Sequence, residues 1–86
     1  MITGTTSSGF EFEISPEAIN DMELLEALCD LDRGDASALA EICRRLLGDQ
    51  KKALYEHLRI DGRVPANKVI EAVGEILAAC KEGKKS

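Results

Sequence analysis

The residues best suited to chemistry are the carboxylates between Asp30 and Glu41, in the segment DLDRGDASALAE. Acids stand at positions 1, 3 and 12 of this segment, from which a calcium-binding EF-hand loop supplies ligands. Position 6, where such a loop needs glycine, is Asp35, and its apolar position 8 is Ser37. The segment is therefore interpreted as an acidic turn in which Asp35 caps the following helix. A calcium-dependent adaptor is kept only as the third of three functional hypotheses, and no metal is expected.

The single histidine and the three cysteines form no catalytic arrangement. His57 lies beside Glu56, with no second histidine and no nearby serine or cysteine in a nucleophile setting, so it is expected to be a surface residue. Cys29, Cys43 and Cys80 are odd in number and fall on or beside apolar helical faces. They are expected to be buried free thiols in a reducing cytosol. No enzymatic activity and no cofactor are predicted.

The charge of the chain argues against nucleic acid as a main partner. The 86 residues carry 16 acidic and 11 basic side chains, a net charge of −5, which opposes binding to a phosphate backbone. The basic residues between positions 44 and 63 are interleaved with acids, so no basic stripe forms. A small helical DNA-binding regulator is kept as the alternative function. Because no apolar run approaches the length of about 18 residues that marks a membrane span, a cytoplasmic protein without membrane contacts is expected.

The hydrophobic residues, 44% of the chain, recur at helical spacing. This pattern predicts a mainly all-α fold, a small bundle of four helices with an N-terminal extended arm or short β-strand. Ser15-Pro16 opens a short helical turn over residues 16–19. Capping acids, glycines and a proline place the four main helices over residues 22–31, 36–47, 50–59 and 65–81.

The two ends of the chain are expected to flank a single helical domain at residues 10–82. Phe10, Phe12 and Ile14 alternate with acids, so they share one side of an extended segment. This segment either lies over the helices or pairs with the sheet edge of a partner. Residues 1–9 are expected to be a flexible leader or one arm of a weak hairpin, no other convincing strand is found, and residues 83–86 are expected to fray.

Two helices carry broader apolar arcs than a single core requires. In the helix at 22–31, Met22, Leu24, Leu25, Leu28, Cys29 and Leu31 share one half of the cylinder, and the last helix has a similar stripe. A stripe of about 100° suffices to face one core, so the surplus either binds a client or is enclosed by the fold itself. The candidate partner-binding residues are Phe10, Phe12, Ile14, Leu24, Leu28, Leu31, Ile70 and Leu77.

Two segments carry a family resemblance, ELLEALCDLDRGD at 23–35 and LLGDQKKALYEHLRIDGRVP at 46–65. Together they resemble the small tail assembly chaperones of long-tailed bacteriophages and prophages with flexible, non-contractile tails. The resemblance covers about residues 10–77. Its leucine spacing is generic to helices, and the segment at 46–65 is the more specific part. The family has no fixed catalytic or ligand motif to carry over.

The resemblance implies a non-enzymatic chaperone that binds the tape measure protein, keeps it soluble and helps to recruit tail tube subunits. It would act in the cytoplasm of the bacterial host and would be absent from the mature virion. In that family a longer, frameshifted form is common, and residues 83–85, Gly-Lys-Lys, could be encoded by a slippery codon run. Self-association of the chain is left open.

Overall fold

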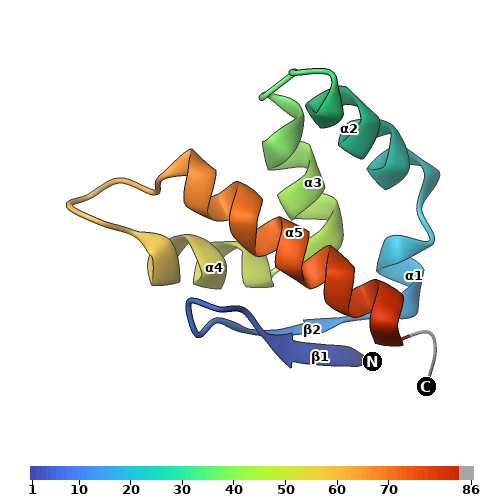
Figure 1. Cartoon of the computed structure of the whole chain (residues 1–86), viewed down its shortest axis with the longest axis horizontal. Helices are drawn as coiled ribbons and strands as arrows, with labels where there is room; N and C mark the ends of the chain where they lie inside the picture. Colours follow the sequence, from blue (N-terminus) through green and yellow to red (C-terminus); the bar gives the residue numbers. More distant parts are fainter. Residues whose placement is uncertain (84–86) are drawn as a thin grey trace.

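The computed structural model describes residues 1–83, with side chains through residue 80. Within this range two strands precede five helices (Figure 1): β1 (Ile2–Thr5), β2 (Glu11–Ile14), α1 (Pro16–Ile19), α2 (Met22–Asp32), α3 (Ala38–Leu47), α4 (Gln50–Leu58) and α5 (Ala66–Gly83). The mainly helical prediction is confirmed, with a short two-stranded sheet at the N-terminus. The predicted frayed tail lies outside the described residues, apart from Gly83.

Several helix ends follow the predicted capping signals. Ser15 Oγ accepts a hydrogen bond from the Ala18 backbone N–H at 3.3 Å, which starts α1. Asp21 caps α2 by accepting hydrogen bonds from two backbone N–H groups of its first turn. Gly48 stops α3 with a φ of +55°, a left-handed value that favours glycine. These ends are set by contacts within a few residues, which is why the sequence predicts them.

The start of α3 differs from the prediction. Asp35 was expected to cap a helix beginning at position 36. Its carboxylate accepts hydrogen bonds from the Ser37 N–H and hydroxyl at 3.1 and 2.5 Å, but residues 36 and 37 form a turn that precedes the helix. The helix therefore begins at Ala38. Asp49, which precedes α4, has helical backbone angles and makes no side-chain capping bond.

The N-terminal residues form an antiparallel hairpin. Ile2 pairs with Ile14 and Thr5 with Glu11, and Gly9 turns the chain with a φ of +98°. Of the two interpretations kept for residues 1–9, the structure therefore has the hairpin, not the flexible leader. The sequence pattern did not reveal strand β1 because Ile2 is its only large apolar residue.

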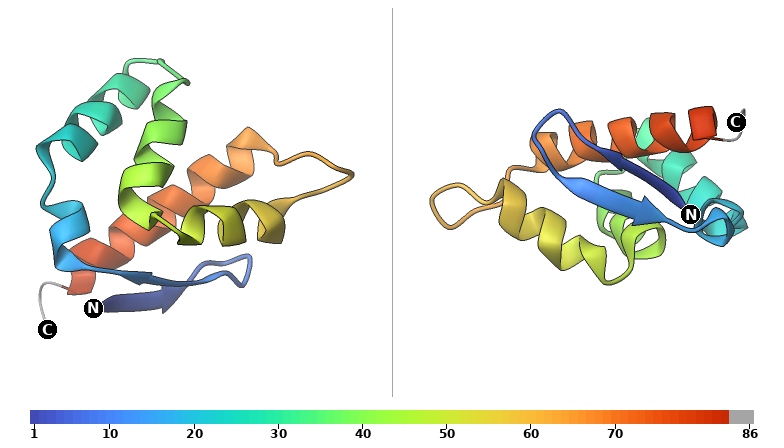
Figure 2. Two further views of the ribbon diagram at one scale, coloured as in Figure 1. Left: turned by 180° about the vertical axis from the view of Figure 1, so that it is seen from behind. Right: turned by 90° about the horizontal axis from the view of Figure 1, so that it is seen from below.

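The hairpin lies across one side of the helices, below α4 and α5 in the left view of Figure 2. Phe10, Phe12 and Ile14 are buried beneath it, which confirms the arm laid over the helices. The Phe12 ring covers Gly4 on the paired strand so closely that a Cβ there would lie 2.8 Å from Phe12 Cζ. Glycine at position 4 therefore leaves room for the aromatic ring that closes this side of the core.

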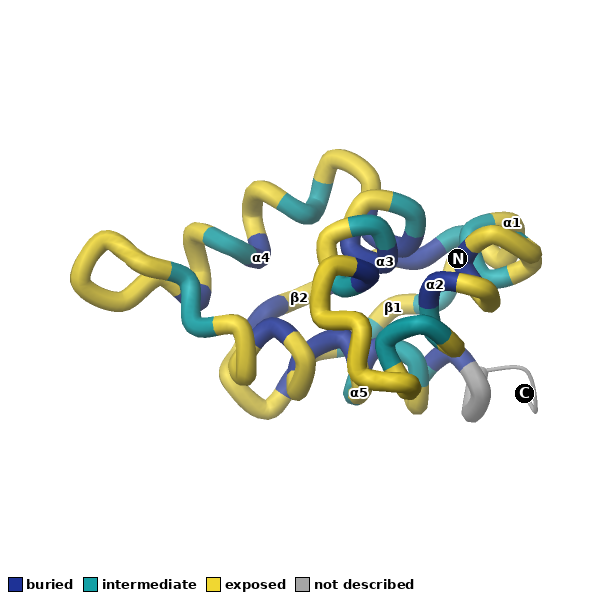
Figure 3. The backbone as a smooth tube through the Cα atoms, turned by 90° about the horizontal axis from the view of Figure 1, so that it is seen from above, coloured by how far each residue is buried: buried dark blue, intermediate teal, exposed yellow. Residues whose placement is uncertain are grey.

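The helices do not confirm the predicted four-helix bundle. α2 and α3 form an antiparallel helical hairpin, and α5 crosses in front of α3 in the view of Figure 1 and packs on α4 and β1. α2 packs mainly on α3, so only one of its sides is covered. Leu24 and Ala27 are its buried residues, and the rest of α2 is half-buried or exposed (Figure 3).

Candidate protein-interaction surface

The eight residues predicted to contact a partner divide by their exposure. Four are enclosed in the core with at most 7% of their surface exposed: Phe10, Phe12, Ile14 and Leu24. Three more are half-buried and pack against that core: Leu28, Leu31 and Leu77. Ile70 is 45% exposed. Seven of these side chains therefore help to hold the chain's own fold together, and Ile70 is the one left exposed.

A second apolar row lies on α2, on the side not covered by α3. It consists of Met22, Leu25 and Cys29, spaced by three and four residues. Met22 is 66% exposed, Leu25 is 48% exposed, and Cys29 is an exposed free thiol. The predicted burial of Cys29 is therefore wrong. On a helical wheel these residues share one half of the cylinder with Leu24 and Leu28, and only the position of α3 separates the two groups.

A groove between β1, α1 and α2 extends this row. Its walls are formed by Met1, Ile2, Pro16, Glu17, Ile19, Asn20 and Leu25. Met1 is 78% exposed, and Ile2 and Ile19 are half-buried. Leu25 belongs to both the groove and the row, and so joins them. We call the combined apolar residues, Met1, Ile2, Ile19, Met22, Leu25 and Cys29, the α2 surface.

The charges around the α2 surface are mostly negative. Glu26, Asp30 and Arg33 line the shallow depression along the row, and Glu17 lines the groove. Arg33 Nη1 lies 3.8 Å from Asp30 Oδ1, and both side chains are at least half exposed. An exposed pair at this distance is weak. The rim therefore presents three carboxylates and one guanidinium that is already directed at one of them.

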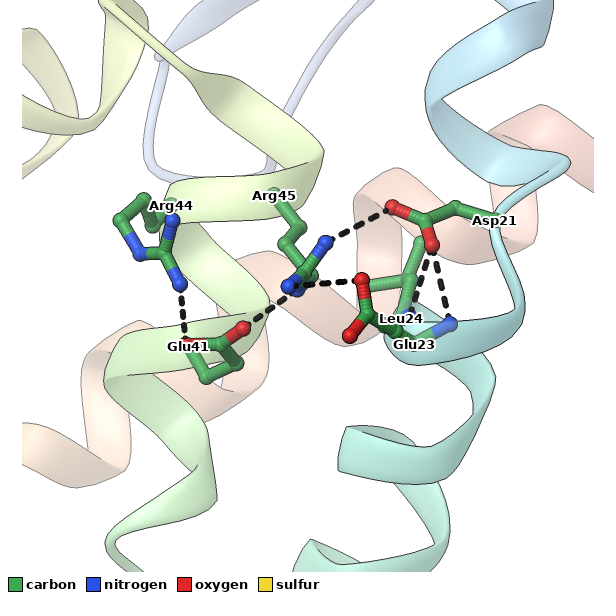
Figure 4. A network of polar contacts seen from close by, with 6 residues as sticks. All are labelled: Asp21, Glu23, Leu24, Glu41, Arg44 and Arg45. Atoms are coloured by element: carbon green, nitrogen blue, oxygen red, sulfur yellow. Dashed lines mark hydrogen bonds and ion pairs between the residues drawn. The ribbon is translucent and has the colours of Figure 1, made fainter.

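Arg45 on α3 fixes the beginning of α2 (Figure 4). Its Nη1 lies 3.3 Å from Asp21 Oδ2, its Nη2 lies 3.1 Å from Glu23 Oε1, and its Nε pairs with Glu41 on its own helix. Hydrogen bonds from Arg44 and Arg45 lower the pKa of Glu41, and the bond to Glu41 raises the pKa of Arg45. Arg45 therefore lies between the two helices.

Glu75 and His57 hold the tip of the hairpin that carries Met1 and Ile2. The Ser7 N–H and hydroxyl donate to the two carboxylate oxygens of Glu75 on α5, at 2.6 and 2.7 Å. These bonds lower the pKa of Glu75. His57 on α4 is exposed, as predicted, but its Nε2 lies 2.9 Å from the Ser8 carbonyl oxygen and its ring stands 5.8 Å from that of Phe10.

The hairpin is also held at its other end, on the outer edge of β2. Gln50 at the start of α4 accepts a hydrogen bond from the Glu13 N–H at 2.8 Å and donates one to the Glu13 carbonyl at 2.5 Å. A carboxamide bonded in both directions to one residue satisfies the same backbone groups that a neighbouring strand would bind. This edge position is therefore already occupied within the chain.

The remaining chemical candidates found in the sequence are occupied by structural contacts. Burial raises the pKa of the Cys43 thiol, which disfavours the reactive thiolate. Asp35 bonds to Ser37, and Glu41 pairs with arginines. Among the side chains of residues 1–80, three or more histidine, cysteine or acidic groups nowhere gather so that they could hold a metal ion.

The basic residues considered for nucleic-acid binding are in part neutralised by neighbours. Arg44 pairs with Glu41, and Arg59 Nη2 lies 2.7 Å from Glu56 Oε2. Pairs of this kind leave fewer unpaired cations for phosphates.

Comparisons of this chain with models of protein families, with curated proteins and with solved structures found no match. Its function is therefore inferred from its own residues. Across the described residues, no helix combines the length and the apolar content needed to span a membrane.

Proposed function

We propose that this chain is a non-enzymatic tail assembly chaperone that binds a tape measure protein, keeps it soluble and helps to recruit tail tube subunits. Two lines support the proposal: the α2 surface, and the resemblance carried by residues 23–35 and 46–65. The single observation that carries it is the exposed row of Met22, Leu25 and Cys29 on a helix with one uncovered side. The proposed place of action is the host cytoplasm, with no metal or cofactor.

The row suits a helical client. Residues spaced by three and four along a helix contact a second helix through its own i, i+3, i+4 and i+7 positions. Fully burying a side chain such as Met22 or Leu25 contributes about 1.5–3 kcal/mol. A client helix lying on α2 would cover the side that α3 leaves open, and would complete the helical packing expected of a four-helix bundle.

Co-expression with the tape measure protein tests the proposal. The wild-type chain should increase the soluble fraction of that protein, and Leu25→Glu should abolish the increase. Ile60→Glu is the matched control, because Ile60 is also exposed (56%) but lies on the loop between α4 and α5, far from α2 (Figure 1). A tape measure protein that is equally insoluble with and without the wild-type chain would refute the proposal.

A further inference from the structure

We infer that the segment bound by the α2 surface is an amphipathic helix that carries lysine or arginine beside its apolar row. This inference rests on the proposed function, and it specifies the chemistry of the client. It is argued from the length of the row, the charges at its rim and the types of its side chains.

The length of the surface sets the length of the client. From Met22 to Cys29 the row covers eight residues, or seven steps of 1.5 Å, about 10 Å along the helix. Arg33 extends the same depression by one more turn. The groove beside Met1 and Ile19 continues it at the N-terminal end. Two to three turns of a client helix, with three or four apolar anchors, would therefore cover it.

The charges at the rim select the flanks of the client. Within the described residues, Glu17 and Glu26 have no ion-pair partner. Glu26 stands in the depression one residue after Leu25, and Asp30 one residue after Cys29. A basic residue of the client could pair with each of these carboxylates, whereas an acidic flank would bring like charges together.

The same charges disfavour a second copy of this chain as the occupant. Two α2 surfaces facing each other would place the carboxylates of Glu17 and Glu26 around a shared apolar contact, and Arg33 is the one basic side chain among the described lining residues. Like charges brought together at an interface are destabilising. The surface therefore suits a basic partner better than it suits itself.

The methionines favour a client with many related segments. Met22 and Met1 are the two most exposed large apolar residues, and methionine is flexible enough to fit differently shaped partners. A surface with such anchors discriminates mainly through its charges. Several segments of one long protein could then bind it, provided that each has a basic flank.

Two synthetic helical peptides test the inference. Both carry leucine at i, i+3, i+4 and i+7; one has lysine at the flanking positions and the other has glutamate. At low salt the lysine peptide should bind the intact protein at least about tenfold more tightly, and the difference should shrink in 0.5 M NaCl, where the Debye length is about 4 Å. The combined Glu26→Lys and Asp30→Lys variant should reverse the preference. Glu71→Lys, an exposed change on α5, should leave it unchanged.

Three results would overturn the inference. In the first, Leu25→Glu abolishes the binding of both peptides, but the combined Glu26→Lys and Asp30→Lys variant changes neither affinity. The proposed function would then stand, and the preference for a basic client would be refuted. In the second, neither peptide binds while the tape measure protein is still kept soluble. In the third, sedimentation shows self-association that Leu25→Glu abolishes, which would assign the surface to a second copy. Equal urea midpoints for the variants and the wild type verify that each is folded.

Discussion

The guanidinium of Arg45 lies 3.3 Å from the carboxylate of Asp21, which stands 24 residues earlier in the chain. Asp21 Oδ1 accepts hydrogen bonds from the backbone N–H groups of Glu23 and Leu24, while Oδ2 meets Arg45. One side chain therefore both starts α2 and attaches that start to α3 (Figure 4). Because the α2 surface lies on the uncovered side of the same helix, this contact helps to set its orientation.

Asp21→Ala should lower the free energy of unfolding by about 1 kcal/mol, the usual cost of losing an N-cap. Asp21→Asn keeps a capping oxygen but loses the charge that faces Arg45, so it should be less harmful. The difference between Asp21→Asn and the wild type should shrink in 1 M NaCl, where the Debye length is about 3 Å. Urea unfolding at low and high salt measures both effects. An asparagine variant as unstable as the alanine variant would show that the cap contributes little.

Leu46→Ala should lower the free energy of unfolding by about 2–4 kcal/mol, because it leaves a cavity in the core. Leu46 is only 3% exposed. Leu25→Ala deletes the same atoms from a side chain that is 48% exposed, and should stay within about 0.5 kcal/mol of the wild type. Urea unfolding of the two variants compares a core leucine with a surface leucine directly. Similar losses would mean that α2 is covered on both sides.

Gly4→Ala should destabilise the protein by about 1–3 kcal/mol, the usual cost of overpacking. The new Cβ would lie 2.8 Å from Phe12 Cζ, so the ring or the strand must shift. Gly74→Ala is the control, since Gly74 lies inside α5 and a Cβ added there would meet nothing within 4 Å. It should stabilise the helix by about 0.5–1 kcal/mol. Thermal unfolding should shift in opposite directions for the two variants.

Glu75→Gln should weaken the dependence of stability on acidic pH. Hydrogen bonds from the Ser7 hydroxyl and N–H lower the pKa of Glu75 from its ordinary value of 4.5. The folded state thus favours the ionised form, and its contribution is present above pH 4.5 and lost as the pH falls through the folded-state pKa. Urea midpoints between pH 7 and pH 3 should fall less for Glu75→Gln than for the wild type. Glu71→Gln, on the same helix but without a hydrogen bond to Ser7, should follow the wild-type curve.

The helix ends are features that residues close together in the sequence determine. Ser15 and Asp21 cap helices through backbone groups two or three residues away. Asp61-Gly62, a residue pair typical of turns, also forms one, with φ values of +52° and +80° and a 2.7 Å hydrogen bond from the Ile60 N–H to the Arg63 carbonyl. Each of these features depends on neighbours in the chain, so the sequence alone was sufficient to predict them. The same holds for the mainly helical composition, which follows from apolar spacing.

The features decided by tertiary structure depend on contacts between distant residues. Strand β1 exists because it pairs with β2 and packs on α5, although its own pattern is weak. Arg45 lies between helices because α2 brings two carboxylates to it. The half-cylinder of apolar residues on α2 contains both the buried Leu24 and the exposed Leu25, which are adjacent in sequence. A hydrophobic pattern shows that a face can be buried, and only the helix that packs on it determines which side chains are left for a partner.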